Sequence, residues 1–395
     1  MPPSTEPLLA RLLTALEREL PRAVELRHRL HAEPELAHAE QRTAASVAGE
    51  LPVAGVTVAE TGLAALVGGG AGAPVAVRAE LDGLPLQERT GVSFSARGTV
   101  MHACGHDVHM AALVALARAA GTLAGELPAA LLAVFQPSEE AYPSGAEQLA
   151  RGELDRFDIG AIVAAHVHPE LPWGSVALDP GVVNASCDTV EIVIEGEPTH
   201  GAYPHRGRDP ILALAGVIVA LHAQLARRID PLHPAVLTIG QVDGGTAENV
   251  IPSSARARGA LRAYLPEDRA ALRQLVEDVV AGIAAASGCR GRVALTSGEP
   301  ALENDRGVVA RARTMLVAAG LETAPEWRSC GSDDFAFLGR LAPLAMAFVG
   351  LDGAPGFTRR PLHHPELLPP DEAVGAVART LAVLYLAAAG PPAAG

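Results

Sequence analysis

The 395-residue sequence contains no lysine, so all 31 of its basic side chains are arginines. Several kinds of catalysis require a lysine amine: the Schiff base of pyridoxal phosphate enzymes, the lysine aldolases and the Walker-type phosphate loop. The sequence excludes each of these mechanisms. It also lacks a GxSxG nucleophile elbow and a PCxxC zinc deaminase signature, and the glycine-rich stretch 68–73 precedes Pro74 and a strand pattern instead of a phosphate-binding helix.

Cysteine is scarce, and the four cysteines are Cys104, Cys187, Cys289 and Cys330. They form no CxxC pair, so neither a disulfide framework nor a structural zinc knuckle is indicated. The net charge of -14 without a basic cluster argues against a nucleic-acid partner. The first residues do not resemble a signal peptide, and no apolar run reaches the roughly 18 residues of a membrane span. We therefore expect a cytoplasmic protein that does not bind a membrane.

The patterning predicts an α/β fold in two domains, since 395 residues with 49% hydrophobic content exceed one ordinary core. A helical pattern over 8–36 is interrupted near Pro21, and residues 41–51 and 107–125 are also helical in pattern. Short apolar strand patterns cover 64–69, 74–81, 130–137, 160–169 and 345–351. Such strands alternating with helices indicate a mixed sheet covered by helices on both faces.

The middle of the chain has a different pattern. Strand patterns with one solvated face cover 187–197, 235–245, 254–265 and 291–298, around helical patterns at 209–228 and 267–287. This β-α-β-β-α-β order is typical of the split βαβ arrangement. We predict that residues 187–298 form a smaller α+β domain inserted into a catalytic domain made of residues 1–186 and 299–395. The ends, 1–7 and 390–395, are expected to be disordered.

Polar side chains gather where the predicted strands end. The stretch MHACGHDVH (101–109) contains Cys104 and His106, two metal-ligand residue types separated by a glycine that lets the backbone turn. Ligands bind outside the carboxyl ends of strands in open α/β sheets. Each residue alone has an ordinary explanation, such as a buried cysteine, a core histidine or a solvated acidic loop. Their convergence favours a metal site built from Asp82, Cys104, His106, Glu139, Glu140, His166 and His168.

With these residues assembled, the sequence resembles the aminoacylase/carboxypeptidase family of dinuclear metal amidohydrolases. Within it, the sequence is most similar to the branch of N-acyl-amino-acid amidohydrolases that includes hippurate hydrolase, auxin-conjugate hydrolases and N-acetyldiaminopimelate deacetylase. The resemblance implies hydrolysis of the amide bond between an acyl group and an amino acid. It rests on nine segments in the family's order: 26–36, 78–85, 101–113, 135–149, 166–174, 200–211, 244–262, 330–335 and 362–374.

The resemblance implies two divalent metal ions in each subunit. Thiolate, imidazole and carboxylate ligands together suit zinc, manganese or cobalt without selecting one of them. His102 and His109 remain outside the implied ligand set, and packing or orientation of the ligands is their expected role. The residues at the family's ligand positions are Cys104, His106, Glu140, His166 and His363.

The resemblance also implies how the remaining site residues act. Glu139 matches the general base that takes a proton from the attacking water and delivers it to the leaving amine. Asp82 matches an aspartate that orients a metal-ligating group. His200 matches a lid histidine that reaches a partner subunit's active site, which implies a homodimer formed through the inserted lid and dimerisation domain. Asn249 and Arg262 match positions that hold the substrate carboxylate, although a solvated strand residue is an equal interpretation of Arg262.

The sequence departs from the family pattern at Glu80, Gly83, Ser144 and Asp333, where aspartate, alanine, glycine and glutamate are usual. His168 occupies a position that is often aromatic, so it either lines the acyl pocket or competes with His166 as a ligand. None of these differences removes an implied ligand or Glu139, and none selects an acyl group or an amino acid. Two alternatives stay open: a dipeptidase or carboxypeptidase on the same dinuclear site, and a catalytically silent binding protein on the same scaffold.

Overall fold

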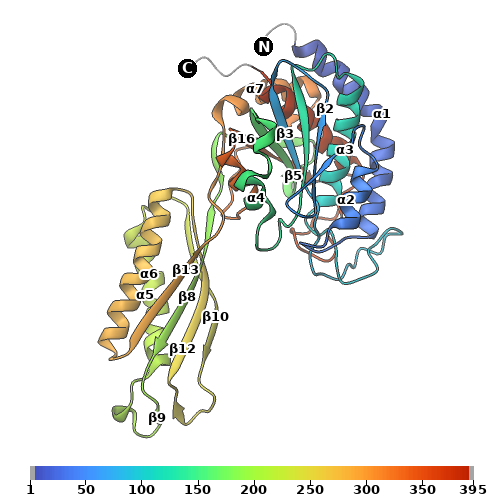
Figure 1. Ribbon diagram of the computed structural model, residues 1–395. Helices are drawn as coiled ribbons and strands as arrows, with labels where there is room; N and C mark the ends of the chain where they lie inside the picture. The colour runs from blue at the N-terminus through green and yellow to red at the C-terminus, as the bar shows by residue number, and fades with distance from the viewer. Residues whose placement is uncertain (1–4, 391–395) are drawn as a thin grey trace. The chain divides into compact units, whose positions relative to one another are not determined.

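The computed structural model describes residues 5–390, which divide into two compact units (Figure 1). The first unit runs to Gly181 and continues over Glu303–Trp327 and from Asp334 onward. The second comprises Val182–Leu302 and Arg328–Asp333. The expected insertion, 187–298, lies within the second unit, which begins five residues earlier and ends four residues later than expected and adds a short later segment. The short strands β7 (Gly181–Asn184) and β14 (Leu302–Asn304) lie where the chain passes from one unit to the other.

The first unit is built on a mixed eight-stranded sheet with the order β1-β2-β4-β3-β5-β16-β6-β15. The four central strands, β4, β3, β5 and β16, run parallel to one another. They are buried on both faces, which explains their nearly continuous apolar sequence. The strand bounds are β1 (Val56–Val58), β2 (Gly62–Val67), β3 (Gly72–Glu80), β4 (Ala129–Gln136), β5 (Ala161–Pro172), β6 (Ser175–Ala177), β15 (Glu322–Thr323) and β16 (Leu344–Asp352).

Helices α3 and α8 pack against the sheet, and α1 packs against both of these helices. Figure 1 shows α1 and α3 side by side along the sheet. The odd-numbered strand residues, such as Val77, Ala133 and Val163, contribute to the core shared with these helices. The helices of this unit are α1 (Thr5–Ala32), α2 (Gln41–Ala48), α3 (His106–Thr122), α4 (Gly145–Gln148), η1 (Leu149–Glu153), η2 (Asp155–Phe157), α7 (Arg306–Leu316), η4 (Val317–Ala319), η5 (Asp334–Arg340) and α8 (Glu372–Ala388).

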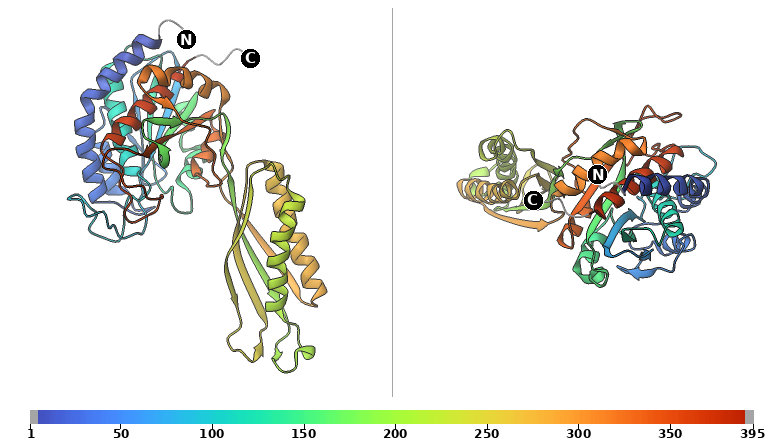
Figure 2. Two further views of the ribbon diagram at one scale, coloured as in Figure 1. Left: turned by 180° about the vertical axis from the view of Figure 1, so that it is seen from behind. Right: turned by 90° about the horizontal axis from the view of Figure 1, so that it is seen from above.

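The second unit is an antiparallel sheet with the order β10-β12-β8-β13 and two long helices. Its elements follow the order expected for a split βαβ arrangement. Both helices lie on one face of the sheet, as the view from behind also shows (Figure 2). The elements are β8 (Ser186–Glu195), β9 (Thr199–His200), η3 (Pro204–Arg206), α5 (Pro210–Arg228), β10 (Ala235–Gly244), β11 (Val250–Ile251), β12 (Ser254–Ala263), α6 (Pro266–Ala286) and β13 (Arg290–Ser297).

The expected fold class, a mixed sheet flanked by helices with an inserted α+β unit, is confirmed, but two local expectations were wrong, the interruption of the first helix near Pro21 and the disorder of residues 5–7. Helix α1 continues through Pro21; burial of leucines along α1, worth about 1.5–3 kcal/mol each, outweighs the cost of about 3 kcal/mol for proline. Residues 5–7 belong to α1, while 1–4 and 391–395 lie outside the described residues. Helix α5 is, by length and composition, apolar enough to cross a membrane, although one face of it packs in the core of the second unit.

Candidate metal centre

Cys104 and His106 are held at the start of α3 by a glycine turn. Gly105 has φ +86°, and a Cβ there would lie 2.5 Å from Val167 Cγ2. A side chain at this position would meet both backbone strain and a clash. Gly105 therefore allows the thiol of Cys104 to lie close to His166 on β5 and the imidazole of His106 to lie beside it.

His106 and His166 each present Nε2 toward the cluster because the other ring nitrogen is engaged. His106 Nδ1 donates to the carbonyl oxygen of Asp82 at 2.8 Å, and His166 Nδ1 donates to the carbonyl oxygen of Val167 at 2.7 Å. Such bonds fix the tautomer with the Nε2 lone pair available for a metal. His166 Nε2 lies 3.4 Å from Cys104 Sγ, and His106 Nε2 is buried without a hydrogen bond.

His109 is excluded as a ligand by its hydrogen bonds. Its Nε2 accepts from the backbone N–H of Val167 at 3.0 Å, and its Nδ1 donates to Glu80 Oε2 at 2.8 Å. Both nitrogens are used, so His109 supports β5 next to His166. His102 is fully buried and makes no hydrogen bond with either nitrogen. Burial lowers the pKa of His102 to about 3, so this ring is neutral.

The acidic residues approach from the ends of β3 and β4. Asp82 Oδ2 accepts the backbone N–H of Glu140 at 2.9 Å, so this carboxylate positions the loop after β4. Glu139 Oε2 lies 3.8 Å from His106 Nε2. His363, from the segment before α8, brings Nε2 to 3.2 Å from Glu140 Oε1, while its backbone N–H donates to Ala103 O at 2.8 Å.

His363 differs from the other clustered residues in two respects. Its side chain is 52% exposed, whereas those of Glu139 and Glu140 are 15% and 13% exposed. Its backbone has φ +65°, a conformation that residues other than glycine rarely adopt. Strain of this kind is often retained at functional sites, where surrounding contacts enforce it.

Six residues at this site contribute donor atoms that form three overlapping groups. Within each group, every donor atom lies within 4.8 Å of the others. The sulfur, nitrogen and oxygen donors fit a divalent transition metal. His106 Nε2 is buried and makes no hydrogen bond, which is costly unless another partner binds there. The residues therefore fit metal ions. The groups are Cys104, His106 and His166; Cys104, Glu140 and His363; and His106, Glu139 and Glu140.

The surroundings of Glu140 and His166 favour the forms that bind a metal. Burial lowers the pKa of His106, but the charges of Glu80 and Asp82 outweigh it and raise the pKa. Burial raises the pKa of Glu140, but the hydrogen bond from His363 and the charge of His106 outweigh it and lower the pKa overall, so the carboxylate is ionised. Burial lowers the pKa of His166 well below its usual value, so this ring is neutral. Burial raises the pKa of Asp82.

The second unit contains the three residues expected to act as the lid or to bind the substrate carboxylate. His200 ends β9 and is exposed, with Nδ1 accepting from the N–H of Ala202 at 3.0 Å. Asn249 is also exposed, and its carbonyl oxygen accepts from Gly201 N at 2.6 Å, beside the pairing of β9 with β11. Arg262 on β12 is half-buried and donates to Cys330 O at 3.0 Å. Arg262 is therefore not a fully solvated strand residue.

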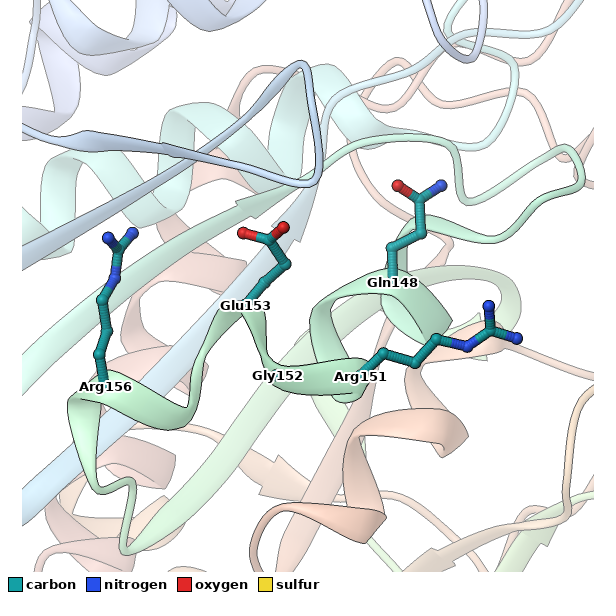
Figure 3. Close-up of a pocket in the computed structure, with 5 residues that line it drawn as sticks. All are labelled: Gln148, Arg151, Gly152, Glu153 and Arg156. Atoms are coloured by element: carbon teal, nitrogen blue, oxygen red, sulfur yellow. The ribbon is translucent and has the colours of Figure 1, made fainter.

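A separate surface pocket of about 600 Å³ lies on η1 and the residues beside it (Figure 3). Its lining is Gln148, Arg151, Gly152, Glu153 and Arg156, and it contains none of the predicted site residues. The side chain of Arg151 is 68% exposed and pairs with Glu147 in the same stretch of chain. The pocket is thus a solvated hollow that is distinct from the metal-ligand cluster.

The sequence model of peptidase family M20/M25/M40 matches residues 76–386. This match covers most of the chain and includes every residue of the cluster. The chain belongs to the M20/M25/M40 peptidase family. The expected family and the expected class of enzyme, a metal-dependent amidohydrolase, are confirmed.

Curated relatives in the M20 family support the same class. N-acetyl-L-cysteine deacetylase of Bacillus subtilis strain 168 is 34% identical over 89% of this chain and 84% of its own length. N-acetyldiaminopimelate deacetylase of Bacillus licheniformis is 32% identical over 91% of this chain and 96% of its own length. A Bacillus subtilis structure described as a dinuclear metal binding peptidase of the M20 family superposes with a TM-score of 0.82 at 29% identity, covering 94% and 98% of the two chains.

Sequence reasoning missed a buried charge network beneath this M20 site. Arg78 donates to Gln136 Oε1 at 2.8 Å and to Asp334 Oδ1 at 2.9 Å, and it also pairs with Glu80. Glu80 in turn holds His109. The signal was present in β3, where Arg78 and Glu80 are two residues apart and so project from the same face of the strand.

Proposed function

We propose that this enzyme hydrolyses the amide bond of N-acyl amino acids and releases a carboxylic acid and a free amino acid. The observation that carries the proposal is the set of overlapping sulfur, nitrogen and oxygen donors with Glu139 at its edge. The Bacillus relatives named for deacetylation of N-acetyl amino acids support this substrate class.

We assign the ligands of two divalent ions, zinc, manganese or cobalt, to five residues of the first unit. When bound, such ions supply Lewis acidity that polarises the scissile carbonyl and increases the acidity of water. Asp82 orients two of the ligands, His106 through its carbonyl oxygen and Glu140 through its side chain. The five ligands are Cys104, His106, Glu140, His166 and His363.

We assign the proton transfers to Glu139. Its carboxylate lies beside His106 Nε2, at the edge of the donor cluster, with its side chain still 15% exposed. A carboxylate in this position can take a proton from the attacking water and later deliver it to the leaving nitrogen. The fixed backbone after β4, held by Asp82, keeps Glu139 in place.

We assign substrate recognition and oxyanion stabilisation to the second unit, with Asn249 and Arg262 binding the substrate carboxylate and His200 acting in a partner subunit. This requires a homodimer through the second unit. Two apolar side chains of α5, Leu212 and Val219, support this requirement because they are 71% and 70% exposed, seven residues apart on one side of the helix. Analytical ultracentrifugation of Leu212→Asp/Val219→Asp against wild type tests it, and wild type sedimenting as a monomer contradicts it.

We place the enzyme in the cytoplasm because free thiols such as that of Cys104 are kept reduced there. All four cysteines are free. Fractionation of cells that produce the protein at natural levels tests this assignment. Recovery in an extracytoplasmic fraction contradicts it.

A substrate panel tests the reaction. N-acetyl and N-benzoyl amino acids are compared with dipeptides, before and after metal removal by a chelator and after addition of zinc, manganese or cobalt. We expect turnover of N-acyl amino acids that disappears with the metal and returns with it. Higher kcat/KM for dipeptides favours the peptidase alternative. No turnover of any substrate by the metal-loaded protein favours the silent binding protein.

A further inference from the structure

The N-terminal motif LRHRLHAEPEL (26–36) has no role in the proposed reaction, although its Arg27 is one of the largest fully buried side chains of the protein. From α1, Arg27 makes three hydrogen bonds in three directions. Nε donates to Asp107 Oδ2 at 3.0 Å, Nη1 to Asp371 Oδ1 at 2.7 Å and Nη2 to Pro369 O at 2.5 Å. Every nitrogen of the guanidinium group is therefore engaged.

The acceptors belong to the two segments that carry proposed ligands. Asp107 directly follows His106 in the first turn of α3. Pro369 and Asp371 lie between His363 and the start of α8. On the side of the donor cluster, the same segments are joined by the bond from His363 N to Ala103 O. Arg27 joins the α3 segment and the segment before α8 a second time, through Asp107, Pro369 and Asp371.

Arg27 and Asp107 form a buried ion pair at this junction. Arg27 and Asp107 have side-chain exposures of 1% and 0%. A buried ion pair of this kind adds little net stability, but it holds its partners in one geometry because the loss of either partner leaves a buried charge unpaired.

We propose that Arg27 is a positioning residue of the metal centre, which sets the separation between the Cys104–His106 turn and His363 by bonding both of their segments. The proposal rests on the proposed function, since it assumes that these residues bind metal. Arginine suits this role because its planar group offers donors in fixed directions to three acceptors, whereas the ammonium of lysine is a point charge on a flexible stem. Arg27→Lys therefore keeps the charge beside Asp107 and loses the bridge.

Metal affinity is the test. The apo forms of full-length wild type, Arg27→Lys and Asp371→Asn are titrated with Co²⁺ against a competing chelator, with visible absorption as the readout and thermal unfolding of the apo protein as a second measurement. Loss of a group that orients metal ligands typically costs about 10–100-fold in affinity. We expect a loss of this size for Arg27→Lys. The loss for Asp371→Asn should be smaller, since Pro369 O and Asp107 still bind Arg27.

Arg118→Lys is the matched control. Arg118 also joins α3 to α1, since Nε donates to Glu19 Oε2 at 2.5 Å and Nη1 to Glu50 O at 3.2 Å, but it does so near the other end of α3. Its replacement is expected to lower the unfolding temperature and to leave the affinity for cobalt unchanged.

The outcomes are distinct. Cobalt affinity of Arg27→Lys equal to wild type, with only the unfolding temperature lowered, overturns the positioning role and leaves the proposed function intact. If Arg27→Lys does not fold, Asp371→Asn decides: weakened cobalt binding supports the role, and unchanged binding overturns it. A wild-type chain that binds no cobalt overturns the proposed function and this inference together.

Discussion

The two units of the protein present their predicted functional residues in opposite ways. In the first unit, the clustered residues come from four separate segments. Cys104, His106 and His166 are buried, and the rings of both histidines are held by hydrogen bonds to backbone carbonyl oxygens. In the second unit, His200 and Asn249 are exposed on the short pairing of β9 with β11. This difference indicates that the side chains of the first unit are already positioned for metal binding in the metal-free protein.

The units also differ in how they use buried charge. The first unit buries Arg27 and Arg78 beneath the cluster, each bonded to several acceptors. In the second unit, the buried Asp188 pairs with Arg269 and Arg273, whose side chains remain 23% and 32% exposed. Buried charge networks cost desolvation energy and restrict geometry. We infer that the buried charges of the first unit fix the positions of the proposed ligands, and that this role offsets their desolvation energy.

The largest expected effect comes from the adjacent carboxylates of the first unit. Glu139→Gln should lower turnover by at least about 100-fold, the usual scale for loss of a general base, and should leave the metal content unchanged. Glu140→Gln should instead lower the metal content, because Glu140 Oε1 lies 3.2 Å from His363 Nε2 in the group of possible metal ligands that they share with Cys104. Steady-state kinetics and elemental analysis of both variants check this. An exchange of the two phenotypes would show that the assignments of base and ligand are reversed.

A second, smaller effect tests whether the exposed residues of the second unit act between subunits. His200→Ala should reduce turnover by about 100-fold, the lower end of the usual cost of losing one oxyanion donor, because the metal ligands and Glu139 stay in place. Mixing His200→Ala with Glu139→Gln should restore activity, because a mixed dimer contains one site with an intact base and an intact His200. Equal mixing gives mixed dimers as half of the total, each with one of two sites complete, so about one quarter of wild-type activity is expected.

The mixing experiment requires proof of subunit exchange, obtained from differently tagged chains. Activity no higher than that of the two parents, with exchange demonstrated, would place the action of His200 within its own chain or remove it from the mechanism. The predicted residues of the two units would then differ only in how exposed their side chains are, and not in whether they act within one chain or between chains.

The smallest effect concerns pH and the charge network of the first unit. Burial lowers the pKa of His31, but Asp107 and Glu88 outweigh it and raise the pKa to about 9. Arg27, bonded to the same Asp107, and the neutral His102 are the other titratable groups at this network. Because the folded-state pKa exceeds the ordinary value of 6.5, His31 stabilises the fold fully below about pH 6.5 and loses this contribution as the pH rises through about 9.

The corresponding measurement is the free energy of unfolding of wild type and His31→Gln between pH 6 and 10, with a chelator present so that metal binding makes no contribution. The difference between the two proteins should be at most about 3 kcal/mol at pH 6 and should shrink steadily toward pH 9. A difference that is independent of pH would show that His31 is neutral and contributes by packing alone.

Sequence reasoning located the elements of both units well because periodicity is a local property. The strand pattern at 130–137 corresponds to β4 (Ala129–Gln136), and the helical pattern at 267–287 to α6 (Pro266–Ala286). The meeting of Asp82, Glu139 and His166 was predictable as well, because parallel strands place their carboxyl ends at one edge of the sheet. His363 came only from the resemblance to a family, since its segment follows no strand of this kind.

What sequence reasoning missed depends on contacts between residues that are distant in the chain. Arg27 and Asp371 are separated by 344 positions, and no periodic pattern connects them. The exclusion of His109 as a ligand depends on its bond from the backbone of Val167, which only the packing of α3 against β5 creates. The uninterrupted course of α1 through Pro21 likewise follows from tertiary burial, not from local propensity.

The central claim is that the first unit alone provides the ligands of two metal ions. Elemental analysis of wild type purified without chelator, then loaded with zinc, manganese or cobalt and desalted, tests it most directly, with Glu140→Gln measured in parallel. We predict two equivalents of metal for each wild-type chain and fewer than two for Glu140→Gln. A loaded wild-type chain that retains no stoichiometric metal, or a Glu140→Gln chain that retains the full two equivalents, would contradict the account.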